Sequence, residues 1–557
     1  MSLGLYIKYQ YITNIRDYGF RGLKMGNKRN ITICVSWPYA NNNLHLGYVA
    51  SSLSGDILAR YHRMVGDDVV MVSGTDSHGT KPTIKAKKEG VTPKDIVDRY
   101  HANFLEALDA FDFSFDKFSI TYDEYHKEKC MEIFKKLYKN GYLYEKVLNR
   151  PYCPTCAKFV ADTEIEITCP ACGKKTKADN CDCGHVPTEA DLEGATCLVC
   201  GGATTQKEDK VLVFKLTAFK DVLTKLVNDN EGVWRTNAIN ETKKYLNDLR
   251  DRDFSRDLEW GVKIPVEGYE NKVVWVWWEA LLGYLTDTMK LGEERGFDYR
   301  KFWKTDVEPE CKKIIYMCHA KDNIVFHSMF LPAMLAGLND NFVVNNTMVS
   351  AEYLMTNNAK ISKSSGTSCE ALDWAKNYNT DSLRYHFAAN GPEKKDANFT
   401  LELYQTTHNT EVVNKFGNLI NRTLKFKGLE EVPHGELAPE IKNMVDVTYK
   451  IVAENIEKIE FKKAAEAAME LVTFANRYYD EQKPWVQAKE DVNSFNNTIY
   501  SCAYVIANLS NIFEPFMPKT CKKIREFLNL DQKPTWKEVQ VIAGTNLDKV
   551  EPLFSRM

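Results

Sequence analysis

The chain has 557 residues, of which 44% are hydrophobic and 27% charged, and its formal net charge is −3. This balance excludes wholesale disorder, and it excludes a histone-like protein that binds nucleic acid through bulk positive charge. No run of about 18 apolar residues occurs, so neither a membrane span nor a membrane partner is expected. The length predicts two or three domains of about 100–200 residues each.

Residues 1–29 carry several basic side chains among scattered aromatic residues but lack the compact apolar core of a secretory signal. We interpret them as an N-terminal extension, and an organelle-targeting segment is the alternative. The basic residues are Arg16, Arg21, Lys24, Lys28 and Arg29.

An α/β pattern begins at residue 30. The β-branched run Ile31–Val35 predicts a strand, and apolar residues at helical spacing then run from Leu46 to a helix end expected at Gly66. Val69–Val72 is typical of a buried strand. This succession predicts a Rossmann-type, doubly wound parallel sheet, and we assign residues 30–145 and 211–345 to it as the catalytic domain. Two further strands are expected at Val273–Trp277 and Lys313–Met317.

Residues 146–210 are an insertion in which Cys, Gly, Thr and Asp rise while large apolar residues become rare. The segment is too poor in apolar side chains to build a core of its own. Eight cysteines in closely spaced pairs, in a chain without a signal sequence, indicate metal ligands in a reducing cytoplasm rather than disulfides. Four thiolates satisfy one tetrahedral Zn²⁺, so one or two structural ions are expected. The eight are Cys153, Cys156, Cys169, Cys172, Cys181, Cys183, Cys197 and Cys200.

The pattern changes again near the turn Asn390-Gly391-Pro392. We assign residues 346–397 to a region that contains a lysine loop, and residues 398–557 to an all-α helical-bundle domain. One face of an expected bundle helix is apolar at helical spacing. Its residues are Phe461, Ala464, Ala468, Leu471 and Phe474.

Two short motifs carry chemistry that suits a nucleotide. His45 and Gly47 open the first helix, and a helix N-terminus collects unpaired N–H groups and partial positive charge that favour a phosphate. The segment Lys360-Ile361-Ser362-Lys363-Ser364 places two lysines in a loop able to clamp a polyphosphate. Taken singly, His45 as a helix cap and the lysine segment as a solvated loop remain alternatives.

Together, in this order, the two motifs form the paired signature of class I aminoacyl-tRNA synthetases. Further segments resemble the methionyl-tRNA synthetases, and the resemblance covers roughly residues 32–554. These segments are Tyr39-Ala40-Asn41, residues 74–80 (GTDSHGT), 277–281 (WWEAL), 320–327 and 480–485 (DEQKPW). Two positions depart from the family pattern: Tyr48 stands in place of a histidine, and Ile361 replaces a methionine.

The resemblance implies an enzyme that activates L-methionine with ATP and Mg²⁺ to methionyl-adenylate and then transfers methionine to the 3′ end of tRNA(Met). The methionine carboxylate is already ionised at neutral pH and needs no general base, so the protein must position the reactants and stabilise charge. His45, Lys360 and Lys363 are the implied catalytic residues. The implied ATP-binding set is His45, Gly47, Tyr48, Asp322, Lys360, Ser362 and Lys363, with Arg256 as a further candidate.

For methionine, the resemblance implies a pocket in which Asp76 holds the ammonium group, since a buried amine needs a carboxylate partner. Core packing is the alternative for each aromatic residue, above all for Trp277 in its expected strand, and helix capping is the alternative for Asp322. The implied pocket residues are Tyr39, Asp76, Trp277, Ala280, Tyr284 and His327.

The resemblance also implies two nested zinc sites and an anticodon site. Cys169, Cys172, Cys181 and Cys183 would form the inner zinc site, with His185 as an alternative ligand, and the other four cysteines the outer one. Trp485 would stack on an anticodon base, with Asn414 and Arg422 as base-reading partners, and Asn418 is a second candidate for the last role. Because the chain ends soon after Phe554, a monomer is expected.

Three rival functions share part of this pattern. Leucyl-, isoleucyl- and valyl-tRNA synthetases share both signatures but carry an editing insertion larger than residues 146–210. A cysteinyl-tRNA synthetase uses zinc in its amino-acid pocket, whereas these cysteines lie in one insertion. A non-catalytic RNA-binding paralogue would show damage at His45, Lys360 or Lys363, and all three are present.

Overall fold

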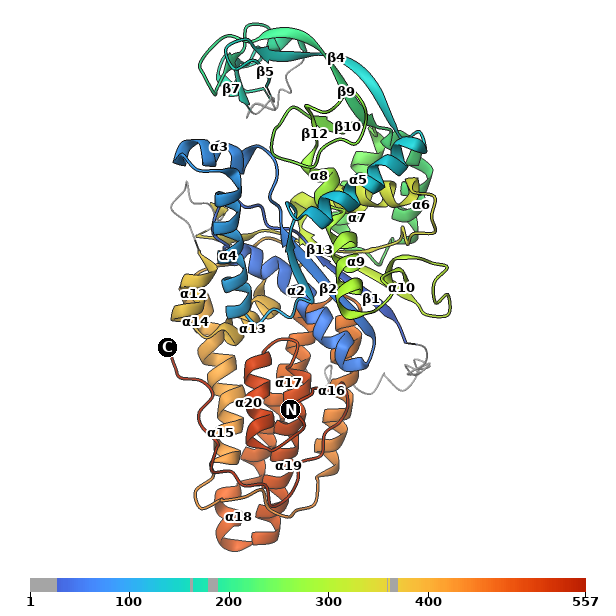
Figure 1. The fold of residues 1–557 in the computed structure, drawn as a ribbon. Helices are drawn as coiled ribbons and strands as arrows, with labels where there is room; N and C mark the ends of the chain where they lie inside the picture. Colours follow the sequence, from blue (N-terminus) through green and yellow to red (C-terminus); the bar gives the residue numbers. More distant parts are fainter. Residues whose placement is uncertain (1–27, 161–163, 179–188, 358, 361–368) are drawn as a thin grey trace.

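The computed structural model describes residues 28–160, 164–178, 189–357, 359–360 and 369–557. These residues form three parts in a row: the insertion at one end, the α/β domain in the middle and a helical bundle at the other end (Figure 1). None of the helices within these ranges combines the length and the apolar character needed to span a bilayer.

The α/β domain is built on a five-stranded sheet in the order β14-β13-β1-β2-β3, and every pairing in it is parallel. This confirms the doubly wound architecture. The helix predicted after β1 is α2, Leu46–Val65, and it ends at Gly66, which adopts a left-handed φ of 100°. The strands are β1 (Asn30–Val35), β2 (Asp68–Thr75), β3 (Lys117–Ile120), β13 (Lys313–Ala320) and β14 (Thr347–Ala351).

Shorter elements surround the sheet. The helices of this domain besides α2 are α3 (Thr80–Glu89), α4 (Pro93–Ala110), α5 (Glu124–Lys139), η4 (Leu216–Phe219), α6 (Lys220–Asp229), α7 (Thr236–Asn247), α8 (Val276–Ala280), α9 (Gly283–Arg295), α10 (Arg300–Trp303), η5 (Lys321–Asn323), the π-helix η6 (Phe326–Phe330) and α11 (Leu331–Gly337). The short strands are β10 (Arg252–Asp253), β11 (Ser255–Arg256) and β12 (Val273–Val274).

The strand predicted at Val273–Trp277 is wrong beyond its first two residues. Strand β12 stops at Val274, and α8 begins at Val276, so Trp277 lies on a helix. A short apolar run rich in valine and tryptophan fits a strand and a buried helix equally well, because it carries no periodicity that separates them.

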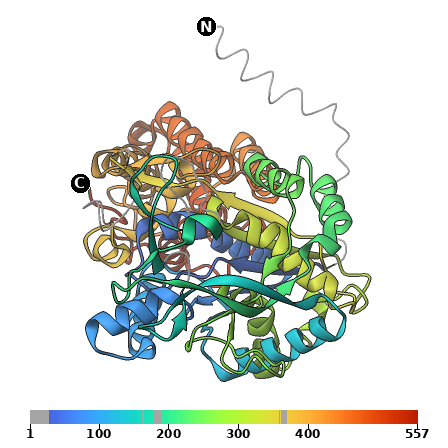
Figure 2. The same cartoon turned by 90° about the horizontal axis from the view of Figure 1, so that it is seen from above.

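The insertion is carried on a long antiparallel hairpin of β4 (Leu143–Cys153) and β9 (Thr205–Phe214). Figure 2 looks down on this end and shows the hairpin lying across the top of the α/β domain. The described part of its apolar core is small, and two of its seven residues are cysteines of the predicted metal set. The remaining elements are β5 (Lys158–Phe159), β6 (Ile165–Thr168), β7 (Lys175–Lys177), η3 (Glu189–Leu192) and β8 (Thr196–Cys197).

Beyond β17 (Ala397–Phe399) the described chain is helical, as predicted, until Phe527, after which the described residues form no helix. The apolar face predicted for α17 packs into the bundle, where Ala464, Ala468 and Leu471 are fully buried. The elements after β14 are β15 (Leu354–Thr356), β16 (Ala359–Lys360), α12 (Ala371–Asn377), α13 (Thr380–Asn390), β17 (Ala397–Phe399), α14 (Leu401–Thr407), the π-helix η7 (His408–Gly417), α15 (Asn418–Leu424), α16 (Pro439–Glu457), α17 (Phe461–Gln482), α18 (Pro484–Glu490), α19 (Val492–Ile512) and α20 (Pro518–Phe527).

Candidate functional site

A cleft of about 370 Å³ opens at the carboxyl ends of β1 and β13. These two strands are neighbours from which the chain proceeds to opposite sides of the sheet, the position where doubly wound proteins bind ligands. Four residues of the predicted ATP set line the cleft together: His45, Gly47, Tyr48 and Asp322. Residues far apart in the sequence thus reach one cavity because they follow adjacent parallel strands.

The first turn of α2 forms one wall of the cleft. His45 is the N-cap residue, and its Nδ1 accepts a hydrogen bond of 3.3 Å from the backbone N–H of Tyr48. The ring therefore caps the helix and lines the cleft at once, so the two readings of His45 are compatible. The Tyr48 hydroxyl donates to the carbonyl of Ser36 at 2.9 Å, and burial raises its pKa to about 12. Tyr48 thus stays protonated and is tied to the end of β1.

The lysine motif is only partly described. Lys360 ends strand β16, while Ser362 and Lys363 lie outside the described residues. On the far side of the motif, the N–H of Leu46 donates to the carbonyl of Cys369 at 2.8 Å, and the N–H of Ala371 donates to the carbonyl of Leu44 at 2.8 Å. The segment that carries the lysines is therefore anchored at its C-terminal end directly beside His45.

Of the residues predicted to bind methionine, Tyr39 lines this cleft, and the others lie outside its lining. Tyr39 and Asp76 form a parallel bridge beyond the ends of β1 and β2. Asp76 is 4% exposed, and its Oδ1 has no hydrogen-bond partner within the described part of the chain. Burial first, and the charge of Glu279 second, raise the pKa of Asp76 well above its usual value. An ionised carboxylate that is buried without a partner is unfavourable, so a cation bound beside Asp76 would stabilise it.

Tyr284 and His327 form a second buried pair. The Tyr284 hydroxyl donates to Nε2 of His327 at 2.8 Å, while Nδ1 of the same ring donates to the carbonyl of Asn323 at 2.8 Å. Burial lowers the pKa of His327 to about 4, so the imidazole is neutral at pH 7 and this tautomer is fixed. The pair therefore presents a polar edge without a net charge.

Trp277 is half-buried and stacks on Phe326 with ring centroids 3.7 Å apart, and Ala280 is buried on the same short helix, α8. Phe326 was not predicted, because nothing in a lone phenylalanine distinguishes a pocket wall from core. Arg256, a further candidate for ATP, does not line the cleft that contains His45; its guanidinium lies over the ring of Trp275 and donates to Asp253 at 3.2 Å.

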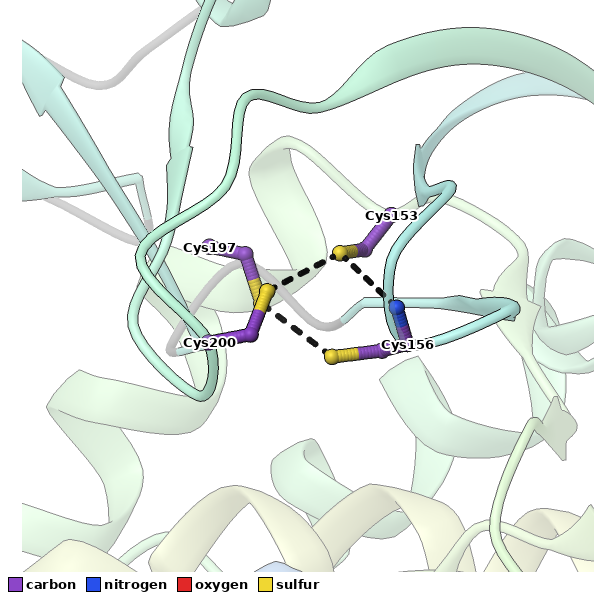
Figure 3. Close-up of side chains that lie close together, drawn as sticks. All are labelled: Cys153, Cys156, Cys197 and Cys200. Atoms are coloured by element: carbon purple, nitrogen blue, oxygen red, sulfur yellow. Dashed lines mark hydrogen bonds between the residues drawn. The ribbon is translucent and has the colours of Figure 1, made fainter.

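In the insertion, four of the eight predicted metal ligands meet (Figure 3). The ligand atoms of all four lie within 4.8 Å of one another; Sγ atoms of Cys153 and Cys200 are 3.4 Å apart, and those of Cys156 and Cys197 4.0 Å. A tetrahedral Zn²⁺ with Zn–S bonds of about 2.3 Å requires sulfur separations of about 3.8 Å, which these distances bracket. The N–H of Gly202 is the main cause that lowers the pKa of Cys200 to about 7, which favours a thiolate.

A second cysteine pair repeats the turn of the first set. The N–H of Gly173 donates to the carbonyl of Cys169 at 2.8 Å, as the N–H of Gly201 donates to the carbonyl of Cys197 at 2.8 Å. Both glycines adopt a positive φ, of 70° and 76°. Cys169 and Cys172 therefore sit in a metal-binding type of turn. Their predicted partners Cys181 and Cys183, and His185, lie outside the described residues.

Comparison with known proteins decides the family. A model of class I tRNA synthetases (M) matches residues 31–424, and a model of the anticodon binding domain of methionyl tRNA ligase matches residues 432–554. The chain belongs to the methionyl-tRNA synthetases. Membership confirms the predicted enzyme class, an ATP-using aminoacyl-tRNA ligase that charges tRNA with methionine.

Individual relatives align with this chain over nearly its whole length. Methionine–tRNA ligase 1 of Alkaliphilus oremlandii is 38% identical over 533 residues, and a methionine–tRNA ligase of Bacillus cereus strain B4264 is 40% identical over 537; each alignment covers 95% of this chain and 97% of the relative. The solved structure of Mycobacterium tuberculosis methionyl-tRNA synthetase in complex with methionyl-adenylate matches with a TM-score of 0.77 and 24% identity. That match spans 95% of this chain and 100% of the other, and it shows the shared fold.

In this member of the family, the predicted anticodon residues lie on the helical bundle far from the cleft. Trp485 is 47% exposed on α18, which forms the end of the molecule opposite the insertion (Figure 1). Asn414 is exposed on η7, and Arg422 follows on α15. Arg422 donates to Asp480 Oδ1 at 2.8 Å and lies over the ring of Tyr479, so it is already engaged. Asn418 is exposed between them and contacts Asn476 at 3.5 Å.

One buried network near the residues predicted to bind methionine was not assigned from the sequence. Glu279 is fully buried and bonds two imidazoles, His78 Nδ1 at 2.8 Å and His126 Nε2 at 2.9 Å. The Tyr39 hydroxyl donates to the carbonyl of His78, so this network holds the ring predicted to contact methionine. Burial would raise the pKa of Glu279, but the charge of His78 and the bonds from both imidazoles lower it. His78 and Glu279 both stand in segments that resemble the family, which was the only available signal.

Proposed function

We propose that the cleft at β1 and β13 binds ATP and that the predicted methionine residues beside it bind methionine, so that the two substrates meet at the edge of the sheet. The observation that carries this proposal is the position of Asp76, a buried carboxylate with an unpartnered oxygen beside the cleft that contains His45 and Gly47. A methionine ammonium on Asp76 would leave the methionine carboxylate facing the nucleotide.

In the first step, a carboxylate oxygen of methionine attacks the α-phosphorus of ATP, and the bond from that phosphorus to the bridging oxygen of pyrophosphate breaks. The carboxylate is the nucleophile as it stands, so no residue has to remove a proton. The first turn of α2 supplies backbone N–H groups and its dipole, and His45 adds a ring donor, toward the phosphates. Lys360 and Lys363 neutralise the charge that develops on the departing pyrophosphate.

The side chain of methionine is apolar and carries a polarisable sulfur. A wall made of Trp277 and Phe326 suits the thioether and its methylene groups, because sulfur packs favourably on aromatic rings. The neutral Tyr284–His327 pair adds polarity without charge, which rejects charged side chains. Tyr39 and Ala280 complete the proposed pocket.

Two metal ions belong to the proposal. Mg²⁺ accompanies ATP and neutralises phosphate charge when it is bound. Zn²⁺ fits the set of Cys153, Cys156, Cys197 and Cys200, where four thiolates close the coordination sphere, so its role is structural. A measured zinc content near one ion per chain would assign this set alone, and a content near two would also assign the set that includes Cys169 and Cys172.

In the second step, a ribose hydroxyl at the 3′ end of tRNA(Met) attacks the carbonyl carbon of the adenylate and AMP leaves. The helical bundle identifies the tRNA by its anticodon, with Trp485 as the stacking surface and Asn414 and Arg422 as base-reading side chains. Single-stranded bases are commonly read in this way, by stacking together with polar contacts to their edges.

The experiment that tests the activation step is amino-acid-dependent ATP–pyrophosphate exchange without tRNA, measured with each of the twenty amino acids. We expect exchange with methionine alone. Exchange with cysteine instead would assign a sister synthetase. A folded, zinc-loaded sample that shows no exchange with any amino acid would contradict the proposal and favour a non-catalytic RNA-binding role.

A further inference from the structure

The corner between α16 and α17 is one of several places where the helical bundle meets the α/β domain. Ile459 lies in this corner with a left-handed φ of 53°, which is unusual for a β-branched residue and marks a position held by its surroundings. Its side chain is buried, and its carbonyl accepts a hydrogen bond of 3.2 Å from Nη2 of Arg235 in the α/β domain. A cavity of about 400 Å³ borders the same corner and the N-terminus of α7.

Arg235 is the N-cap residue of α7 and is only 9% exposed. Besides the bond to Ile459, its Nη1 donates to the carbonyl of Ser350 at 3.1 Å, while Glu393 lies 4.0 Å away. Its Nε is buried and has no hydrogen-bond partner within the described residues. One guanidinium therefore bridges the bundle and the end of strand β14, at the cost of a donor that is left unused.

A second residue of the same turn continues the connection to the cleft. Asn237 donates to Glu352 Oε1 at 2.9 Å and accepts from the Ser350 hydroxyl at 2.6 Å. Glu352 in turn pairs with Lys321 at 2.7 Å, immediately before Asp322. Glu352 and Asp322 both line the ATP cleft. The polar contacts thus run without interruption from the bundle to the cleft.

We propose that Arg235 and Asn237 are positioning residues that couple the helical bundle to the ATP cleft, so that tRNA held on the bundle raises the rate of charging. The inference rests on the proposed function, because it requires that Trp485 and its neighbours bind the anticodon. It adds a route: movement at the α16–α17 corner is transmitted through Ser350 to Glu352, which lines the cleft. The cavity beside the corner provides the space for that movement.

The protein offers a matched control at the same corner. Arg29 also connects the two parts, since its guanidinium pairs with Glu457 at 2.8 Å and with Asp67 at 2.6 Å. Glu457 is the last residue of α16, two positions before Ile459. Neither Arg29 nor Asp67 lines the cleft. Arg29→Met therefore removes a contact between the same two parts without breaking the route.

The test compares Arg235→Met, Asn237→Ala and Arg29→Met in the full chain. For Arg235→Met we expect methionine-dependent exchange without tRNA within threefold of the parent, a fall of tenfold or more in kcat for tRNA charging, and an unchanged KM for tRNA. Asn237→Ala should also lower the ratio of tRNA charging to methionine-dependent exchange. It serves as the second variant because Asn237 is only half-buried, so its replacement disturbs folding less. Arg29→Met should leave the ratio of charging to exchange unchanged.

A double-mutant cycle with Trp485→Ala then tests transmission. The cycle is measured as kcat for charging at saturating tRNA, and we expect the loss of kcat caused by Trp485→Ala to be smaller in the Arg235→Met background than in the parent. Equal losses of exchange and charging in Arg235→Met and Asn237→Ala, or fully additive effects with Trp485→Ala, would overturn the coupling. A parent that shows no methionine-dependent exchange would overturn the proposed function instead. If Trp485→Ala alone has no effect on charging, the anticodon assignment fails, and the coupling that requires it is overturned as well.

Discussion

The proposed methionine pocket and the proposed anticodon surface lie at separate places in the molecule and are constructed in opposite ways. Around the pocket, Asp76, Tyr284 and His327 are at most 4% exposed. Tyr284 and His327 are hydrogen-bonded to each other, and Oδ1 of Asp76 is buried. At the end of the bundle, Trp485 is 47% exposed and Asn414 is exposed as well. A small substrate has few atoms, so its recognition needs a fixed and dry pocket. RNA offers a large surface, so exposed stacking residues are sufficient.

The largest expected effect on activity comes from a substitution in the proposed methionine pocket. Asp76→Asn keeps the shape of the side chain but removes the only charge proposed to meet the methionine ammonium. Breaking a buried charge pair in this way costs about 3–5 kcal/mol, so kcat/KM for methionine should fall by about a hundredfold or more in the exchange assay.

Binding of tRNA is the control for this substitution. The variant should bind tRNA as the parent does, because Asp76 follows β2 in the α/β domain, whereas the proposed anticodon residues lie on the bundle. A loss of exchange below about tenfold would show that Asp76 does not hold the ammonium.

At the exposed end, Trp485→Ala should leave exchange unchanged and weaken tRNA charging. Stacking of a base on an aromatic side chain is worth about 1–3 kcal/mol, so KM for tRNA should rise by roughly tenfold. Val492→Ala is a matched control, since Val492 is 61% exposed at the start of the next helix, α19. A variant without Trp485 that charges tRNA normally would contradict the anticodon assignment.

The pH dependence of methionine binding distinguishes the two ends further. Burial, together with the charge of Glu279, raises the pKa of Asp76 in the free protein, whereas the ammonium of methionine favours the ionised carboxylate. Below that raised pKa, each fall of one pH unit reduces the ionised fraction about tenfold, so KM for methionine should fall as pH rises and then level off. Exchange kinetics across pH 6–9 measure this. In Asp76→Asn, KM for methionine should no longer depend on pH in this way. KM for tRNA should not show this pH dependence in either protein.

Sequence information was most useful where one local pattern determines one local structure. The run Ile31–Val35 and the helix from Leu46 to Gly66 could be predicted because strand and helix periods, and a glycine end, leave few alternatives. The cleft followed, because parallel strands bring their carboxyl ends to one edge. Trp277 was misplaced in a strand because its neighbours are apolar on every side.

The buried network around Glu279 shows why the rest could not be predicted. Glu279 and His78 are separated by 201 residues, and nothing in a single sequence indicates which distant side chains will meet. Arg422 illustrates a different limit: the sequence supplied an arginine at a suitable spacing, but its bond to Asp480 depends on how α15 packs beside α17. Pairings of this kind arise from tertiary packing, which propensity and periodicity do not encode.

The smallest expected effect tests that last contact. Asp480 is 61% exposed and Arg422 21%, and exposed ion pairs contribute about 0–1 kcal/mol, so Asp480→Ala should change the free energy of unfolding by less than about 1 kcal/mol. The effect on RNA should nevertheless be measurable. Without Asp480, the guanidinium remains held by the Tyr479 ring and the Asn476 carbonyl, but its charge is available to a phosphate.

We therefore expect Asp480→Ala to bind tRNA about twofold more tightly at low salt, with a plot of log affinity against log salt that is steeper by about 0.7, the value for one added phosphate contact on single-stranded RNA. Salt titrations of tRNA binding to the parent and the variant measure both quantities. Arg422→Ala should reverse both changes, because it removes the cation itself. If the salt dependence of Asp480→Ala equals that of the parent, Arg422 does not contact RNA phosphate, and the proposed contact with a base edge is the only RNA contact left to it.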